Sequence, residues 1–213
     1  MKKIIIITFA LALALFSCKD EEATVQPYNI TSQINNLPQE ALNSDEIESL
    51  FIMREEEKLA HDVYTTLYNK WGVNIFQNIA ASELKHTNAV LTLLTKYDLA
   101  DPVDNNVIGV FSNPIIQDLY DQLVSQGNVS TLEAFKVGAT IEDLDIFDLN
   151  NWMIKVDNED ISLVYANLTK GSRNHMRSFY SQIISSGGTY TAQYLSQAEL
   201  DAIINSPMET GAW

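Results

Sequence analysis

Along most of the chain, hydrophobic residues recur every three or four positions, which is the spacing of one buried face of an α-helix. Few segments show the strict alternation that is typical of a half-buried strand. The sequence therefore predicts an all-α protein with four long helices and two short ones. The long helices are expected at about 44–71, 74–97, 130–152 and 158–186, and the short ones at about 114–125 and 196–204.

Local signals set the expected helix ends. Ser44 is predicted to cap the first long helix, because Asp45 and Glu46 follow it as acids in the first turn. Gly72 is predicted to stop that helix. Capping boxes, in which a serine is followed three residues later by a glutamate, are expected at Ser130–Glu133 and Ser196–Glu199.

The lengths of the connections predict the topology. Tight turns join the first long helix to the second and the third to the fourth, so each pair is expected to form an antiparallel hairpin. About thirty residues separate the two pairs, and they carry the short helix at 114–125. The predicted fold is a four-helix bundle of two hairpins joined by one long crossover, followed by a small C-terminal helix.

The N-terminus has the features of an export signal. Two lysines precede an apolar run over residues 4–16, which has the length of a signal-peptide core and is too short to span a bilayer comfortably. The run leads into Leu-Phe-Ser-Cys18, which resembles a bacterial lipobox. We therefore expect residues 1–17 to be a lipoprotein signal peptide and Cys18 to carry the lipid. The alternative is a stray thiol after an ordinary signal peptide.

The segment after Cys18 predicts where the protein is located. Residues 19–22, Lys-Asp-Glu-Glu, are similar to the signal that directs Bacteroidetes lipoproteins to the outer face of the outer membrane. Residues 18–36 contain few large apolar side chains and are expected to be the lipidated cysteine and a flexible tether. Residues 37–205 are then the folded domain, and residues 206–213 are a C-terminal tail.

Charge and cysteine content exclude several kinds of partner and site. The chain has 28 acidic and 13 basic residues and a net charge of −15. Such a surface repels nucleic acid phosphates and anionic headgroups and attracts cations. We therefore expect no nucleic acid partner and membrane contact through the lipid anchor only. Cys18 is the only cysteine, which excludes an intramolecular disulfide and a cysteine-rich zinc site.

Polar residues interrupt the apolar face of every long helix near its middle. Glu83 and His86 are three positions apart, so they share one helix face and are able to reach the same metal. Four carboxylates converging in a core would repel one another, and two divalent cations would balance them while neutral imidazoles complete the coordination. The predicted ligands of this metal pair are Glu57, Glu83, His86, Glu142, Asp145 and His175.

Each of these residues also has a simpler interpretation. Glu57 follows two other glutamates, and such a run is typical of a solvated helix face. Glu142 and Asp145 are compatible with an exposed acidic face, and a single histidine such as His175 usually lies at the surface or in a hydrogen bond. Only their joint occurrence on all four helices favours a buried metal site.

Two more residues of the first helix are expected near the ligands. His61 lies one turn beyond Glu57 and is predicted to form an ion pair or to support a ligand from outside the coordination sphere. Tyr64 lies two turns beyond Glu57 on the same face. It is predicted either to hydrogen-bond a ligand or simply to fill the core.

These segments resemble the rubrerythrin-type branch of the ferritin-like superfamily. The motifs that carry the resemblance are Glu57-Lys58-Leu59-Ala60 with Tyr64, Ser82-Glu83-Leu84-Lys85-His86, and Glu142-Asp143-Leu144-Asp145. The sequence resembles still more closely an uncharacterised prokaryotic domain family, through residues 54–60, 78–83 and 171–175. This second resemblance covers about Leu37 to Ile204.

The resemblance implies a ferritin-like bundle around a di-iron site, but one position departs from it. The family's fourth helix carries a second Glu-x-x-His, whereas here Ser172 replaces the glutamate and His175 is present. Only Asp145 is placed to compensate. An asymmetric pair, a single metal or an open coordination position would each be consistent with this loss. The chain also has no Cys-x-x-Cys to hold a rubredoxin-like iron centre.

Together these features lead us to expect a non-haem di-iron oxidoreductase that acts on dioxygen, hydrogen peroxide or ferrous iron, with two iron ions as cofactors. The alternatives are another divalent metal, a non-enzymatic lipoprotein that captures or buffers metal, and a metal-free helical interaction module. A homodimer is a further expectation, for which the sequence identifies no interface.

Overall fold

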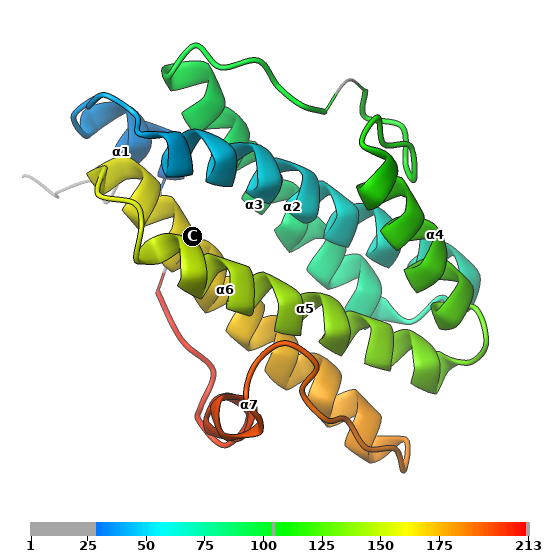
Figure 1. Cartoon of the computed structure of the whole chain (residues 1–213). Coiled ribbons are helices and arrows are strands. Elements are labelled where there is room, and N and C mark those ends of the chain that lie inside the picture. The colour runs from blue at the N-terminus through cyan, green and yellow to red at the C-terminus, as the bar shows by residue number, and fades with distance from the viewer. Residues whose placement is uncertain (1–28, 104, 212–213) are drawn as a thin grey trace, which may run out of the picture.

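The computed structural model describes residues 29–103 and 105–211. In this part of the chain all regular secondary structure is helical, and there are no strands (Figure 1). The predicted all-α class is therefore confirmed. The helices are α1 (Ile30–Asn36), α2 (Ser44–Trp71), α3 (Asn74–Lys96), α4 (Pro114–Gly127), α5 (Thr131–Met153), α6 (Glu159–Ser185) and α7 (Gln197–Ile204).

The four long helices form two hairpins. Helix α2 packs mainly against α3, and α5 packs mainly against α6. The first hairpin turns at Gly72, whose φ of 66° is left-handed and suits a residue without a Cβ. Contacts of α3 with α6 and of α2 with α5 then join the hairpins side by side (Figure 1). The predicted helix pairs are confirmed, with bounds that differ from those expected by two residues or fewer.

The helix caps follow the local sequence closely. Ser196 and Glu199 form the predicted capping box of α7. Ser130 caps α5 by accepting from the backbone N–H of Glu133, but the reciprocal bond is missing because the Glu133 carboxylate accepts from Lys136 and Gln126. The predicted cap of α2 is off by one residue, since Asn43 and not Ser44 forms a capping box with Glu46.

The prediction that residues 18–36 form a flexible tether is wrong for its last seven residues. Ile30–Asn36 form helix α1, which packs against α3 and α6. Ile34 is completely buried, and the Lys96 ammonium donates to the carbonyls of Ile34 and Leu37 at 2.8 Å and 3.0 Å. A short helix with one apolar position in each turn is too sparse a pattern to recognise in the sequence, but the bundle provides the surface that buries it.

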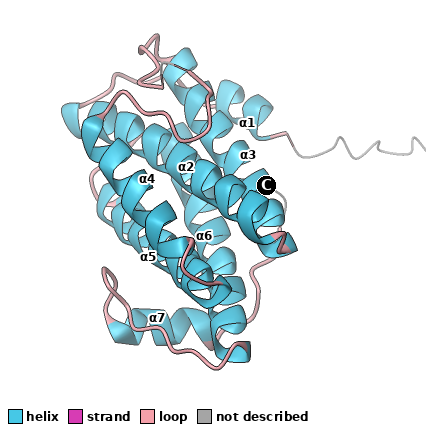
Figure 2. Ribbon diagram, turned by 90° about the vertical axis from the view of Figure 1, so that its right-hand side faces the viewer, coloured by secondary structure: helices cyan, strands magenta, loops and turns pink. Residues whose placement is uncertain are grey.

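The long crossover runs over the outer face of α2. Its helix α4 packs on both α2 and α5 (Figure 2). The preceding loop contacts α2 through buried charges: the Lys58 ammonium donates to the carbonyls of Val107 and Val110 at 3.2 Å and 3.4 Å, and the Gly109 N–H donates to Asp62 at 3.0 Å. The loop is therefore fastened to α2 through its residues 107–110.

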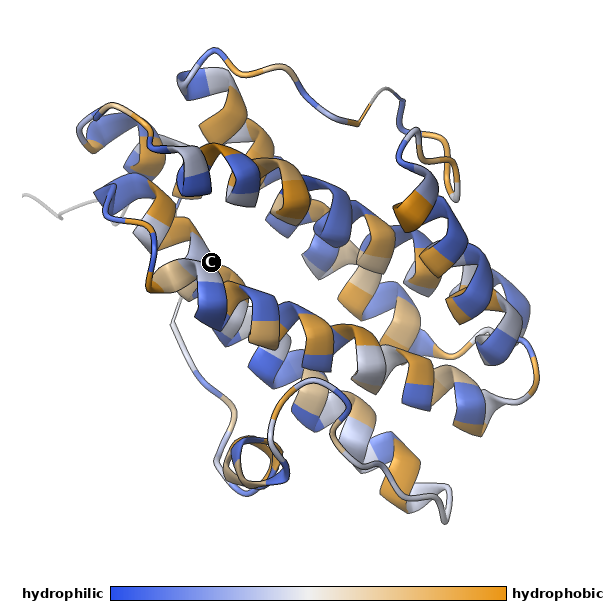
Figure 3. Cartoon of the chain, viewed as in Figure 1, coloured by the Kyte–Doolittle hydropathy of each residue, from blue (hydrophilic) through white to orange (hydrophobic). Residues whose placement is uncertain are grey.

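The core is divided into two apolar clusters with a polar layer between them. On α2, Leu50 and Met53 belong to one cluster and Leu59–Leu67 to the other, so Glu57 lies between them. The same order holds on α3 and α6. Figure 3 shows how hydrophobic and hydrophilic positions alternate along each long helix. The fold therefore brings the middle of every long helix to one level.

Some predictions concern parts of the chain that the structure does not describe. The predicted signal peptide, Cys18 and most of the predicted tether lie outside the described residues. Within the described residues, no helix combines the length and apolar character needed to cross a membrane.

Candidate metal centre

The polar layer contains five of the six predicted ligands, and each long helix contributes at least one. These five side chains are almost completely buried: Glu57, Glu83, His86, Glu142 and His175. They form two overlapping groups in which the possible ligand atoms all lie within 4.8 Å of one another. The interpretation of these residues as solvated surface charges is therefore wrong.

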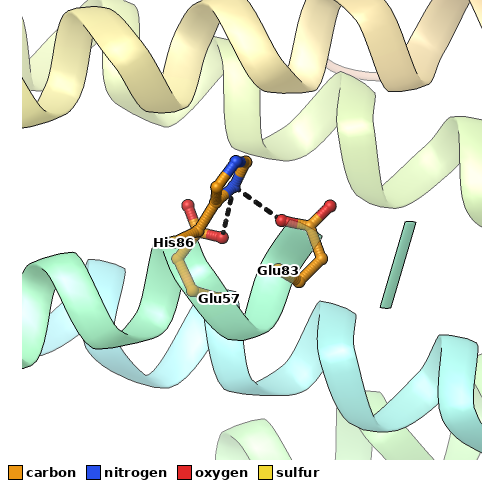
Figure 4. A group of neighbouring side chains, drawn as sticks. All are labelled: Glu57, Glu83 and His86. Carbon is orange, nitrogen blue, oxygen red and sulfur yellow. Dashed lines mark hydrogen bonds and ion pairs between the residues drawn. The ribbon is translucent and has the colours of Figure 1, made fainter. Parts of the chain in front are cut away.

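The first group joins the two helices of the first hairpin. His86 Nδ1 lies 2.6 Å from Glu83 Oε2 and 3.1 Å from Glu57 Oε2, and Figure 4 shows the imidazole between these two carboxylates. Glu83 and His86 reach the same point because residues three apart lie on one face of α3. One helical turn and one neighbouring helix thus supply three donor atoms.

The second group connects the two hairpins. His175 Nδ1 of α6 lies 2.7 Å from Glu83 Oε1 and 3.5 Å from Glu142 Oε2 of α5. Glu83 therefore belongs to both groups, with one carboxylate oxygen facing each histidine. The two imidazole rings stack with their centroids 5.6 Å apart. This arrangement allows two cations to share Glu83.

Several of these buried atoms lack a hydrogen bond. They are Glu57 Oε1, Glu83 Oε1 and His175 Nδ1. The last two are only 2.7 Å apart, yet their angles do not satisfy a hydrogen bond, so the contact is close without being aligned. Buried polar atoms without partners are costly and rare in folded proteins. Carboxylate oxygens, and an imidazole nitrogen once it has given up its proton, are ligands that suit a divalent transition metal.

The histidines hold protons when no metal is present. Burial alone would lower the pKa of His86, but the carboxylates of Glu83 and Glu57 outweigh it and raise that pKa to about 10. The pKa of His175 is likewise raised by Glu83 and Glu142 against the effect of burial. Burial alone would raise the pKa of Glu83, but His175 and His86 lower it well below its usual value.

The other carboxylates respond mainly to desolvation. Burial raises the pKa of Glu57 to about 8, against the attraction of His86, and it also raises the pKa of Glu142. Glu57 and Glu142 therefore bind protons more readily than carboxylates in water, whereas Glu83 does not. A metal ion would replace these protons, because it binds the deprotonated carboxylate and the neutral imidazole.

Tyr64 contacts a predicted ligand, as expected. Its hydroxyl lies 2.5 Å from Glu142 Oε1 and donates to that oxygen, and the Gly138 carbonyl lies 3.3 Å away. The ring is completely buried and packs beside Phe179, with ring centroids 5.2 Å apart. Both interpretations of Tyr64 are therefore correct, because the ring fills the core while the hydroxyl orients a carboxylate.

Asp145 and Ser172 are found together beside the two groups. The Ser172 hydroxyl donates a hydrogen bond to Asp145 Oδ2. Asp145 is half-buried and belongs to neither group of possible ligands, although it lines the same cavity as Glu57, Glu83 and Glu142. The serine that replaces the expected glutamate is thus paired with the acid predicted to compensate for it.

His61 lies apart from the predicted ligands. Its Nδ1 forms an ion pair at 2.8 Å with Asp62, which belongs to the buried charges beneath the crossover. Of the two roles predicted for His61, the ion pair is the one found. Asp62 also pairs with Lys58, one turn earlier on α2.

One residue of this region is missing from the predicted set. Glu56 lines the same cavity as the candidate ligands, and its Oε2 is buried without a hydrogen-bond partner. It precedes Glu57, so on a helical wheel it falls about 100° away from the buried face. The only signal for it in the sequence is its place in the run of three glutamates, which does not distinguish their surroundings.

Comparisons with known proteins place the chain in a family. Residues 46–207 match the family described as "Uncharacterized protein domain (DUF2202)". The chain is 56% identical to "Uncharacterized protein MJ0754" of Methanocaldococcus jannaschii over 178 residues, which are 84% of this chain and 96% of the relative. It is also similar to the crystal structure of hypothetical protein MJ0754, with a TM-score of 0.80 and 57% identity over 81% of this chain and 99% of that one. The chain therefore belongs to the DUF2202 family.

Proposed function

We propose that the protein binds two iron ions in its polar layer and acts as a non-haem di-iron oxidoreductase on dioxygen, hydrogen peroxide or ferrous iron. One observation carries the proposal: three buried polar atoms of the layer, which are possible metal ligands, have no hydrogen bond. Two of them, on Glu83 and His175, lie 2.7 Å apart without the angles of a hydrogen bond. A cation that displaces the proton of His175 would bind these atoms and compensate for the crowded carboxylates.

The proposed ligands divide between the two ions. Glu57 and His86 would hold one ion, and Glu142 and His175 would hold the other. Glu83 would serve both, since each of its oxygens faces one histidine. When bound, the iron pair would supply the electrons for reducing the oxidant.

The residues around the ligands have their own parts in this proposal. Tyr64 orients Glu142 through its hydrogen bond, which fixes the direction of that carboxylate. Ser172 donates to Asp145 and so holds a further carboxylate near the layer. Because Ser172 offers no carboxylate in place of the expected glutamate, we propose that the two ions would have unequal surroundings and that one would keep a position open to an oxidant.

The arrangement of the helices supports a ferritin-like bundle. Two hairpins are joined by a long crossover, and glutamates and histidines project inward from all four helices at one level. Di-iron carboxylate proteins of the ferritin-like type combine these two features. We therefore propose this superfamily for the DUF2202 domain.

Elemental analysis of the purified protein tests the proposal directly. The protein should contain about two irons per chain after anaerobic loading with Fe(II), and a Glu83→Ala/His86→Ala variant should contain almost none. The loaded protein should then oxidise Fe(II) or consume peroxide faster than free iron does. Metal-free protein after loading would refute the site, and bound iron without turnover would refute the oxidoreductase.

Capture or buffering of a divalent metal is the second candidate. The missing glutamate at Ser172 favours it, because a weaker second site suits reversible uptake better than catalysis. The net charge of −15 would also concentrate cations around the protein. Stoichiometric, reversible binding of zinc or manganese, with no redox turnover of iron, would select this function.

We further propose that the protein acts at the cell envelope, anchored to the outer membrane through a lipid on Cys18 and exposed on its outer face. The membrane would then be contacted only through this anchor. Mass spectrometry of the protein from its membrane fraction should find a lipidated cysteine at the N-terminus. A Cys18→Ser variant should leave the membrane fraction, and an unchanged membrane location would refute the anchor.

A further inference from the structure

A cavity connects the polar layer with the surface between α2, α4, α5 and the segment before α7. The space comes to about 450 Å³ when the open solvent at its mouth is counted, so the enclosed part is much narrower. Its walls are apolar residues of the helices: Leu59, Ala60, Leu119, Leu123, Ile141 and Leu144. Tyr194, which is 41% exposed, lines it on the side of the C-terminal segment. The candidate metal centre is therefore connected to solvent on this side of the bundle.

Carboxylates follow this cavity from its inner end outward. Glu57, Glu83 and Glu142 line it and are at most 2% exposed. Glu56 and Asp145 also line it but are half-buried. None of the described residues that line it is a lysine, an arginine or a histidine. Basic groups therefore meet only the inner glutamates, through His86 and His175 behind the wall, and the wall beside Glu56 and Asp145 has none.

Glu56 lines this cavity but is not among the candidate metal ligands. Its Oε2 is buried without a partner, as is Glu57 Oε1, and both residues line the cavity. Asp148, which is half-buried one turn beyond Asp145 on α5, adds a further carboxylate near Glu56. An oxygen that is desolvated and unpaired beside two other acids is an efficient site for a cation.

The mouth is held in place by a separate anchor. Asp143, which is completely buried, accepts from the backbone N–H groups of Gln193 and Leu195 at 2.6 Å and 2.8 Å and from the Tyr190 hydroxyl at 2.8 Å. These bonds fix the segment that carries Tyr194 against α5. The opening is therefore built into the fold and does not depend on a free loop.

We infer that this cavity is the path by which divalent cations reach the polar layer, with Glu56, helped by Asp145 and Asp148, as a transit site that binds each ion on its way inward. The inference rests on the proposed metal centre and adds to it a route and an outer binding residue. An uncharged oxidant needs no carboxylates along its path, whereas a cation that loses its hydration water between apolar walls does.

Cobalt(II) uptake by the metal-free protein tests the route, because bound cobalt is seen by its visible absorption without any turnover. Glu56→Gln should slow uptake about tenfold, since one charge of the path is lost. The final content should stay at two ions per chain. Asp148→Asn should slow uptake less. Glu55→Gln is the matched control, because Glu55 accepts from Asn113 beneath the crossover at 3.0 Å and faces away from the cavity.

The outcomes separate this inference from the metal centre itself. Unchanged uptake in both Glu56→Gln and Asp148→Asn would overturn the route and leave the centre standing. Loss of one ion at equilibrium in Glu56→Gln would overturn the transit role and make Glu56 a ligand. Absence of cobalt from the unaltered protein would overturn the centre and the route together. A dependence of the uptake rate on salt that is weaker in Glu56→Gln would support the route.

Discussion

Helix α2 carries buried charged side chains on two faces, and the two faces differ in whether these charges are paired. On the outer face, beneath the crossover, positive and negative groups satisfy one another: Arg54 holds Asp101 in a two-point contact at 3.0 Å and 2.9 Å, and Lys58 pairs with Asp62. On the inner face, Glu57 meets further carboxylates, and some of its neighbours' atoms have no hydrogen bond.

This difference separates a structural charge cluster from a candidate functional one. The outer cluster needs no further component, because its charges balance and its donors have acceptors. The inner layer contains more acids than bases, and its two histidines keep protons only because carboxylates surround them. Buried charge is therefore a weak indicator of function by itself, whereas buried polar atoms without a hydrogen bond identify the side chains that a ligand would satisfy.

The largest expected difference between the two faces concerns metal. Glu83→Ala/His86→Ala should abolish the rise in stability that metal gives the unaltered protein, about 4 kcal/mol at a metal concentration of a thousand times Kd. Thermal unfolding with and without Fe(II), under anaerobic conditions, measures this rise. An equal rise in the double variant would show that metal stabilises the protein from another site.

The outer cluster should respond in the opposite way. Asp101→Ala leaves the buried guanidinium of Arg54 without its carboxylate and should lower the free energy of unfolding by about 2 to 3 kcal/mol, because Asp101 itself is partly exposed. Urea denaturation measures the loss. The metal content of the folded variant should remain that of the parent, and a loss of metal would show that the two faces are coupled.

The pH dependence of the stability of the metal-free protein should reflect the protons held in the inner layer. Glu57, with a folded pKa of about 8, and His86, with one of about 10, keep protons that the unfolded chain releases near 4.3 and 6.5. The folded state therefore holds about one and a half more protons than the unfolded state, and stability should fall as the pH rises from 6.5 to 8, by about 2 kcal/mol per pH unit. Urea denaturation in the presence of a chelator measures this slope.

Metal should remove that slope and release protons. Ligands bind metal in their deprotonated forms, so cobalt added to a weakly buffered solution at pH 7 should acidify it. Glu57→Gln should release fewer protons and show a smaller pH slope in its metal-free form. A metal-free protein whose stability rises with pH in this range would contradict the protonation described for His86 and Glu57.

The smallest expected effect concerns Tyr64. Tyr64→Phe keeps the buried ring and removes only the hydrogen bond to Glu142, so the free energy of unfolding should change by about 1 kcal/mol. Metal affinity should fall about tenfold, because Glu142 loses the group that orients it. Isothermal titration of the variant beside Tyr68→Phe, a half-buried tyrosine one turn further along α2, separates the two effects. An affinity equal to that of the parent would leave Tyr64 with a packing role only.

The sequence by itself determined the helices and most of the candidate ligands. Caps such as Ser196 with Glu199 and stops such as Gly72 act within a few residues, so their effect is readable from local sequence. Glu83 and His86 meet because a helix brings residues three apart onto one face. Periodicity also indicated which carboxylates interrupt an apolar face, since the helical repeat is the same in every surrounding.

Only the tertiary structure decided which surroundings residues of the same type have. Glu55, Glu56 and Glu57 follow one another, yet one accepts from Asn113 beneath the crossover, one lines the cavity and one enters the polar layer. The helix in the expected tether forms because α3 and α6 bury Ile34. Burial, charge pairing and hydrogen-bond partners come from segments distant in the chain, and helical periodicity carries no information about which segments those are.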